Sequence, residues 1–180
     1  MINILLSVRR PSSGFILDGK KPWELRKNAP YIPLGERVTL WTYEFGKDGA
    51  RAIIGKCRMV SSVRMFYMPS GRALELLIKG ACVTEEHIRA YLPFYAWSVQ
   101  DPVRLPAAVP LSAIGLTRPP QSWQYLTDDQ AAILEQAMNT CESCDHWDLS
   151  DCPGTMCWEC KHDSKYPLGH WELRKEENEK

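Results

Sequence analysis

The sequence lacks an excess of charge of either sign and lacks a long hydrophobic run. Its 180 residues include 22 Lys and Arg against 22 Asp and Glu, so the formal net charge is zero. Binding to long duplexes scales with the phosphates that a protein neutralises, so a neutral chain is poorly suited to it. No apolar run approaches the roughly 18 residues that span a bilayer. The apolar start INILL is too short for a secretion signal. Arginines follow this apolar segment, whereas in a secretion signal the positive residues precede it. We therefore expect a cytoplasmic protein without a membrane partner.

The sequence also lacks an internal repeat, and its length suits one ordinary domain with an appendage. Apolar alternation and turn residues predict strands at residues 4–8, 23–27, 38–45, 50–66 and 94–105. Helical patterns occupy residues 11–18, 70–81, 84–92 and 127–139, and residues 111–126 read as a loop. This order predicts an α+β fold: a small mixed β-barrel, closed or half-closed, with helices inserted between the later strands.

Several single residues indicate where these elements end or bend. Gly19 is placed to stop the first helix, and Thr84 to cap a later one. Gly55 and Pro102 interrupt strand patterns, which is typical of a bulge, a bend or an edge strand. A capping box of Thr127 and Gln130 predicts the start of the last helix.

One short stretch, GKKPWELRKNAP at residues 19–30, is strongly basic. It belongs to a region, residues 1–40, that holds seven cations and three anions, a local charge of +4. Lys21 supplies a compact charge and Arg26 a planar fork, the two complementary ways to hold a phosphate or carboxylate. Glu24 lies between them and could hold both by ion pairing. Such a run is also typical of a solvated strand with weak ion pairs, and we expect Lys21 and Arg26 to be exposed.

The same residues carry a resemblance to a known family. Gly19, Lys21, Glu24 and Arg26 match the pattern G-x-K-x-x-E-x-R of ASCH domains, which are relatives of the PUA RNA-binding fold. The later segment PPQSWQYL, residues 119–126, resembles the closing segment of phage and prophage members. The resemblance covers roughly residues 1–126 and implies a PUA-like β-barrel whose cleft is lined by the basic motif.

The resemblance implies binding of single-stranded RNA or of a modified nucleotide or nucleoside. One branch of the family hydrolyses the acetyl amide of N4-acetylcytidine, and there the motif lysine activates a threonine three residues later. Glu24 occupies that position here, so the hydroxyl nucleophile is missing. The alternative function is therefore a hydrolase, an amidohydrolase or ribonuclease, with Lys21 and Glu24 as catalytic residues.

Aromatic and polar residues elsewhere complete the candidate site. Trp123 and Tyr125 offer stacking faces, worth ~1–3 kcal/mol per base, whereas Trp23 and Trp41 suit the core. Arg9 either serves the cleft or caps a strand end, and Ser122 and Tyr125 either contact a ligand or close the barrel. The candidate ligand-binding residues are Lys21, Glu24, Arg26, Arg9, Tyr43, Ser122, Trp123 and Tyr125.

Five of the seven cysteines lie within residues 141–160, as expected of a metal module in a cytosolic chain. Cys141-x-x-Cys144 and Cys157-x-x-Cys160 predict four thiolates around one structural zinc ion, and iron is the alternative. Cys152 is a reserve ligand, followed by His146 and His162. Cys57 and Cys82 are expected to be free thiols.

Four segments follow from these patterns: the barrel domain (residues 1–126), a connecting helix (127–140), the zinc module (141–172) and a disordered tail (173–180). The zinc module could also dock a protein partner. A second alternative is therefore an interaction protein in which the cleft has no ligand of its own.

Overall fold

The computed structural model describes residues 1–138. The chain divides into two units, Met1–Ile133 and Leu134–Lys180, and the fold described below is that of the first. The strands are β1 (Ile2–Arg9), β2 (Trp23–Arg26), β3 (Val38–Phe45), β4 (Ala52–Met65), β5 (Phe94–Val109) and β6 (Trp123–Tyr125). The helices are α1 (Ser12–Leu17), α2 (Gly71–Ala81), α3 (Glu85–Tyr91), the 3-10 helix η1 (Leu111–Ile114) and α4 (Asp128–Gln136).

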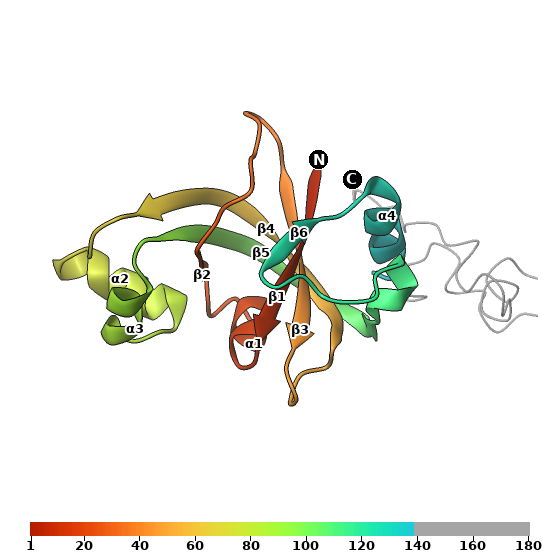
Figure 1. Ribbon diagram of the computed structural model, residues 1–180, viewed down its shortest axis with the longest axis horizontal. Helices are drawn as coiled ribbons and strands as arrows, with labels where there is room; N and C mark the ends of the chain where they lie inside the picture. The colour runs from red at the N-terminus through yellow and green to blue at the C-terminus, as the bar shows by residue number, and fades with distance from the viewer. Residues whose placement is uncertain (139–180) are drawn as a thin grey trace, which may run out of the picture. The chain divides into compact units, whose positions relative to one another are not determined.

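The six strands form one mixed sheet in the order β2-β5-β4-β3-β1-β6. β1 and β3 are parallel, and the other neighbours are antiparallel. The sheet curls into a half-barrel, and α2 and α3 lie together at the far end of the long β4–β5 pair (Figure 1). The α+β class and the helices inserted between β4 and β5 agree with the prediction. The backbone ladder is open, because β2 and β6 are its two edges.

Two clusters of buried side chains hold this unit together. The inner cluster fills the half-barrel with residues of α1, β1, β3, β4 and β5, including Ile4, Leu40 and Trp97. The outer cluster joins β2 and β5 to α2 and α3 through Leu25, Ala96 and neighbouring apolar residues. Alternate residues of β2 and β5 thus serve opposite faces of the sheet, as strand periodicity requires.

The local signals lie where the sequence predicted them. Gly19 follows α1 with φ +71°, and Thr84 accepts a hydrogen bond from the backbone N–H of His87. Register shifts occur beside Gly55 and across from Pro102 in the β4–β5 pairing. A Cβ at Gly55 would lie 2.5 Å from the carbonyl oxygen of Val103, so the close approach at this bulge requires glycine.

The loop predicted for residues 111–126 is wrong in part. It contains η1 and the short strand β6, which pairs antiparallel with β1 and places Trp123 beside Leu6. Three residues are too short for a periodicity signal, and the partner strand lies more than a hundred positions earlier in the chain.

α4 begins at the predicted capping box, where Thr127 and Gln130 exchange backbone and side-chain hydrogen bonds. The end of the connecting helix, the zinc module and the tail lie outside the described residues. The four-segment division of the chain therefore stays a prediction. Within residues 1–138, no helix is long and apolar enough to cross a membrane.

Candidate functional site

The basic motif runs from the end of α1 into β2, and pairing with β5 fixes where its side chains face. Glu24 pairs with Trp97 and Arg26 with Tyr95. Paired residues of antiparallel strands share a face, and Trp97 belongs to the inner cluster. Glu24 and Arg26 therefore face the interior of the half-barrel. The alternation of this strand predicts Trp23 and Leu25 on the inward side instead, and that side is wrong, because Leu25 packs with α2 and α3 on the opposite face, which is also apolar.

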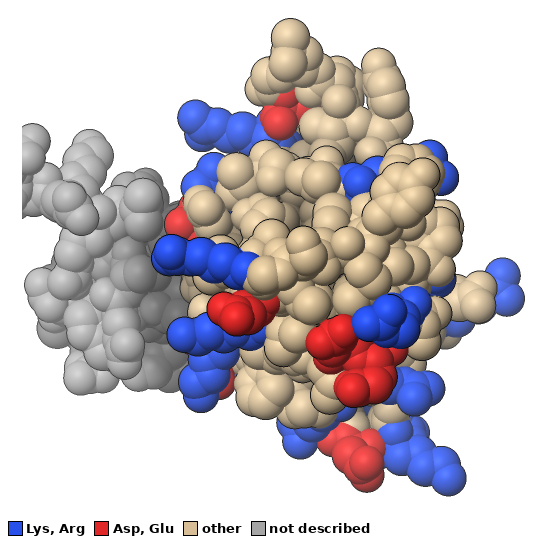
Figure 2. All heavy atoms as spheres, turned by 90° about the vertical axis from the view of Figure 1, so that its left-hand side faces the viewer, with Lys and Arg blue, Asp and Glu red and all other residues tan. Residues whose placement is uncertain are grey.

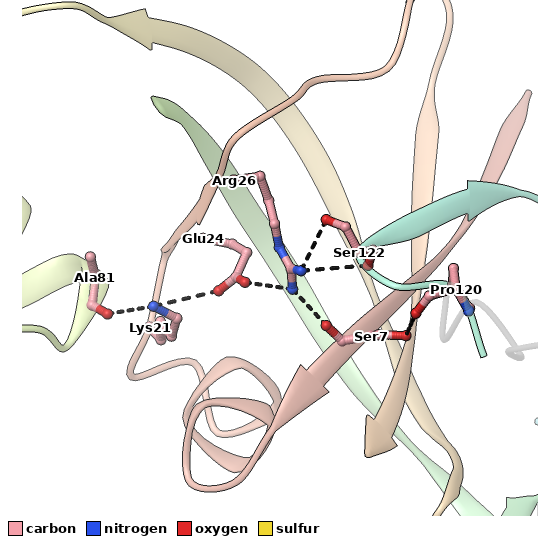
Figure 3. A network of polar contacts seen from close by, with 7 residues as sticks. All are labelled: Ser7, Lys21, Glu24, Arg26, Ala81, Pro120 and Ser122. Atoms are coloured by element: carbon pink, nitrogen blue, oxygen red, sulfur yellow. Dashed lines mark hydrogen bonds and ion pairs between the residues drawn. The ribbon is translucent and has the colours of Figure 1, made fainter. Parts of the chain in front are cut away.

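Lys21, Glu24 and Arg26, here called the motif cluster, form one chain of polar contacts (Figure 3). Glu24 Oε2 lies 3.4 Å from Lys21 Nζ, and Glu24 Oε1 lies 2.7 Å from Arg26 Nη2. Two cations against one carboxylate leave the cluster with a charge of +1. Each oxygen of Glu24 thus faces a different cation.

The expectation that Lys21 and Arg26 are exposed is wrong. Lys21 is 3% exposed, and the side chain of Arg26 is 12% exposed. Lys21 Nζ also donates to the carbonyl oxygen of Ala81, the last residue of α2. Helix C-termini carry unsatisfied carbonyls and partial negative charge. The lysine is therefore buried because it caps α2 as well as pairing with Glu24.

Arg26 bridges the two edges of the sheet. From β2, its Nη2 donates to the Ser7 carbonyl at 2.8 Å, and its Nη1 lies 3.3 Å from the Ser122 hydroxyl and 3.4 Å from the Ser122 carbonyl. Ser7 is on β1, and Ser122 immediately precedes β6. One guanidinium thus closes the half-barrel by side-chain contacts, at a place where no backbone pairing joins β2 to β6.

A second closing contact joins Tyr125 of β6 to Tyr31, in the segment between β2 and β3. Its hydroxyl accepts from the Tyr31 backbone N–H at 2.9 Å and donates to the Tyr31 carbonyl at 3.1 Å. Trp123 is half-buried and packs edge-on against both Trp97 and Tyr125. Tyr125 itself is 48% exposed. Of the aromatic candidates, Trp123 and Tyr125 adjoin the barrel closure made by Arg26 and Ser122.

Some polar atoms on the interior face have no partner among the described residues. They include Arg26 Nε and Trp97 Nε1, both of which are buried. Leaving a buried donor unsatisfied costs roughly 1–3 kcal/mol. Two unsatisfied donors on one interior face therefore indicate a place where water or a polar ligand supplies the missing acceptors.

A hollow of about 300 Å³ reaches the Lys21 end of the cluster, and we call it the Lys21 hollow. Its polar lining is Lys21, Cys57, Gln100 and Asp101. Burial, and then the negative charge of Glu24, raises the pKa of the Cys57 thiol to about 12. The Cys57 thiol therefore lines the hollow in its protonated, uncharged form and does not act as a nucleophile at neutral pH.

The structure places Arg9 and Tyr43 apart from the motif cluster. The Arg9 guanidinium lies 4.8 Å from the centre of the Phe45 ring and lines a separate hollow with residues 45–49. Tyr43 is buried and lines another hollow with residues of η1 and the segment after it. Neither residue has a contact with Lys21, Glu24 or Arg26 among those that the structure describes.

Sequence reasoning did not single out Glu44, a second buried carboxylate. It accepts hydrogen bonds from Arg10, from the Ser13 hydroxyl and from the Ala50 backbone, at 2.7–2.9 Å. Burial raises the pKa of Glu44, but these hydrogen bonds outweigh burial and hold the pKa below its ordinary value. The signal in the sequence is weak because its partners come from two separate segments, residues 10–13 and the loop that ends at Ala50. Because Glu44 accepts hydrogen bonds from three partners, it suits a structural role that anchors the loop after β3.

The predicted zinc ligands Cys141, Cys144, Cys157 and Cys160, with Cys152 in reserve, lie outside the described residues. Within residues 1–138, no group of three or more His, Cys, Asp or Glu side chains is placed to hold a metal ion. Cys57 and Cys82 are free thiols, as expected.

The fold is similar to that of solved ASCH proteins. The crystal structure of ASCH from Zymomonas mobilis matches with a TM-score of 0.60 and 20% identity, covering 74% of this chain and 93% of that chain. A point mutant of the same protein matches with a TM-score of 0.58, 20% identity and coverage of 74% and 94%. No protein-family model matches the sequence, and no curated protein matches it significantly.

A more distant match is human THYN1 in complex with 5-methylcytosine-containing DNA, with a TM-score of 0.43 and 12% identity, covering 78% of this chain and 99% of that chain. That similarity is too low to carry an argument. The Zymomonas structures show the fold alone: the half-barrel of this chain is similar to that of a solved ASCH protein.

Proposed function

We propose that this protein binds single-stranded RNA or a modified nucleotide, with the motif cluster as the floor of the site. The observation that carries the proposal is a buried cluster of charge +1 that retains unused donors. A lysine ammonium has three donors; that of Lys21 donates to the Ala81 carbonyl and forms an ion pair with Glu24 at 3.4 Å. These contacts leave donor capacity for a ligand in the Lys21 hollow, which Lys21 lines. Arg26 Nε is likewise a donor without a partner among the described residues.

The surroundings of the cluster support a ligand of nucleotide size. Ligand pockets begin at roughly 300 Å³, the volume of the Lys21 hollow. Gln100 and Asp101 line it and accept hydrogen bonds from Arg58, and the Gln100 amide N–H and the second Asp101 oxygen remain to contact a base edge. Trp123 and Tyr125 add aromatic faces beside the barrel closure, and exposed faces of this kind stack bases without sequence preference.

The charge distribution favours a single strand or a nucleotide over a long duplex. The chain has no net charge. The face at the α2–α3 end shows Lys and Arg intermixed with Asp and Glu around a central area without charged side chains (Figure 2). No continuous basic surface covers that face, whereas duplex binding relies on many phosphate contacts.

Tryptophan fluorescence of the purified protein tests the proposal, since the chain has seven tryptophans. The ligands are short single-stranded RNA, the matching DNA, a hairpin duplex, and free modified and unmodified nucleosides, each at two salt concentrations. We expect saturable binding to RNA or to one nucleoside, with RNA binding weakened by salt. Equal binding of the duplex and the single strand, or no binding to any ligand, contradicts the proposal.

A second candidate function is hydrolysis in the same place, favoured by the direct contact between Lys21 and Glu24. Glu24 would act as a base on water, with Lys21 holding the substrate oxygen. Both Glu24 oxygens already face cations, which makes binding the better-supported function. Turnover of N4-acetylcytidine, or cleavage of RNA, that vanishes in Glu24→Gln would support hydrolysis. No turnover at high protein concentration would exclude it.

We also propose that Cys141, Cys144, Cys157 and Cys160 bind one structural zinc ion. The spacing of the cysteines is the whole support for this proposal. Four thiolates would leave the ion no open position for water, so its role is to fold its own segment. The segment could then dock a protein partner.

A further inference from the structure

A row of side chains extends the face of the motif cluster across the sheet. Arg26 on β2 pairs with Tyr95 on β5, and Tyr95 pairs with Arg64 on β4. Paired residues point to the same side, so an aromatic ring lies between two guanidinium groups. The alternate residues Leu25 and Ala96 pack with α2 and α3 on the opposite face. The row is therefore on the face that these two helices leave uncovered.

Arg64 is one of several exposed arginines for which no ion pair is found among residues 1–138, and it is set apart by its contacts with two aromatic rings. Arg58, Arg89 and Arg104 form ion pairs with Asp101, Glu85 and Asp18. Arg64 instead lies 4.4 Å from the centre of the Phe66 ring and 5.5 Å from that of Tyr95. Among residues 1–138, no carboxylate forms an ion pair with it. Aromatic faces thus position the guanidinium, and its charge remains unneutralised.

We propose that Arg64, Tyr95 and Phe66 form a second subsite, which binds the nucleotide next to the one held at the motif cluster. This inference rests on the proposed function and assigns the direction in which a strand leaves the site. The planar guanidinium of Arg64 donates two parallel hydrogen bonds to two oxygens of one phosphate. Phe66, 54% exposed, provides the stacking face for the adjoining base.

The spacing and chemistry of the row suit a single strand of nucleic acid. Arg26 and Arg64 are on strands separated by one strand, which places them about 10 Å apart. A single strand can cross this distance with its phosphates toward the arginines and its bases against the rings. Alternating cations and aromatic rings are the features that bind single strands with little sequence preference.

The test measures the affinity of the full chain for a mononucleotide and for single-stranded RNA of two, four and eight nucleotides. The variants are Arg64→Ala, Arg64→Lys and the matched control Arg89→Ala, which removes an exposed arginine of α3. We expect wild-type affinity to rise from one to four nucleotides. In Arg64→Ala, affinity for four nucleotides should fall about tenfold or more, with no change for the mononucleotide. Arg89→Ala should match wild type.

Salt dependence gives an independent readout of the phosphate contact. The slope of log affinity against log salt for four nucleotides should fall by about 0.7 in Arg64→Ala, the value for one phosphate contact on a single strand. Arg64→Lys should restore the slope but only part of the affinity, since lysine lacks the planar fork. Thermal melting confirms that each variant is folded.

Three outcomes overturn the inference and can be told apart. Wild-type affinity that does not rise with length means that no second subsite exists. An increase with length that Arg64→Ala leaves intact places the second subsite elsewhere. Equal losses for the mononucleotide and the longer strands assign Arg64 to the first nucleotide. Absence of binding to every RNA, the mononucleotide included, overturns the proposed function and this inference with it.

Discussion

Glu24 is the residue that holds the motif cluster in its observed geometry. Its two oxygens face Lys21 at 3.4 Å and Arg26 at 2.7 Å, and its side chain is 8% exposed. Removing one member of a buried ion pair leaves an uncompensated charge, which destabilises proteins far more than the loss of a surface pair. The cluster is therefore part of the fold as well as the floor of the candidate site.

Glu24→Gln is expected to lower the free energy of unfolding by about 3 kcal/mol, because it leaves two buried cations without their counter-charge. Urea denaturation measures this change. The matched control is Glu85→Gln, which breaks the exposed ion pair with Arg89 and should cost less than about 0.5 kcal/mol. Equal midpoints for the two variants would show that the motif cluster contributes nothing to stability.

Cys57 and Cys82 are expected to differ sharply in reactivity. Cys57 is buried, and its thiol pKa of about 12 leaves almost no thiolate at pH 8. Cys82 is exposed. Iodoacetamide at pH 8 should alkylate Cys82 and spare Cys57 in the folded protein, and peptide mass mapping reads both sites. Both should react in denaturant. Rapid alkylation of folded Cys57 would mean that the interior is open to solvent.

At the level of elements, the packing of α2 against β2 sets the position of the site. The carbonyl of the last α2 residue, Ala81, accepts from Lys21. One turn of the helix also rests on Trp23, since a Cβ at Gly80 would lie 2.5 Å from the Trp23 ring. A change in the position in which α2 packs against β2 would therefore move Lys21 and the hollow that it lines.

Gly80→Ala is expected to destabilise the protein by about 1–3 kcal/mol, because the added methyl overpacks the contact with Trp23. Gly14→Ala in α1 is the matched control, since its Cβ would meet no atom within 4 Å. That variant should be neutral or stabilising by about 0.5–1 kcal/mol, as alanine favours helix. Thermal and urea unfolding measure both. If Gly80→Ala stabilises the protein, the close packing of α2 against Trp23 is contradicted.

The elements also show which features a sequence can predict. Caps and bulges depend on residues within a few positions, so Thr84, Thr127 and Gly55 were informative by themselves. The burial of Lys21 was not predictable in this way, because Ala81 lies 60 positions away. The bridge from Arg26 to Ser122 spans 96 positions. Strand alternation predicted that Glu24 and Arg26 share one side and that Trp23 and Leu25 share the other, but it carried no information on which side faces the interior of the half-barrel.

On the scale of the whole molecule, an open sheet becomes a half-barrel that side chains close. Arg26 joins β2 to β1 and to the residue before β6, and Tyr125 joins β6 to Tyr31 in the segment after β2. The motif that the candidate site uses is thus also a structural closure. This dual role explains why a cluster of net positive charge can remain buried: each cation is held by protein partners, with donors left for a ligand.

Metal content of the full chain tests the zinc proposal. We expect one zinc per chain in the purified protein by elemental analysis, with loss of metal in Cys141→Ser and Cys157→Ser. Cys82→Ser serves as the matched control and should keep the metal. A chelator should leave the main thermal transition in place, because the half-barrel has its own cores. Full zinc occupancy in both variants, or a chelator that melts the whole protein at low temperature, would contradict the proposal.

The measurement that most directly tests the central claim is the affinity for single-stranded RNA of wild type, Lys21→Met and Lys20→Ala. Met keeps the buried stem of Lys21 and removes the ammonium, while Lys20→Ala removes one charge at an exposed neighbour. We predict a loss of about tenfold or more in Lys21→Met, with Lys20→Ala close to wild type and all three proteins folded by thermal melting. Equal affinities for the three folded proteins would show that the motif cluster closes the barrel and binds no ligand.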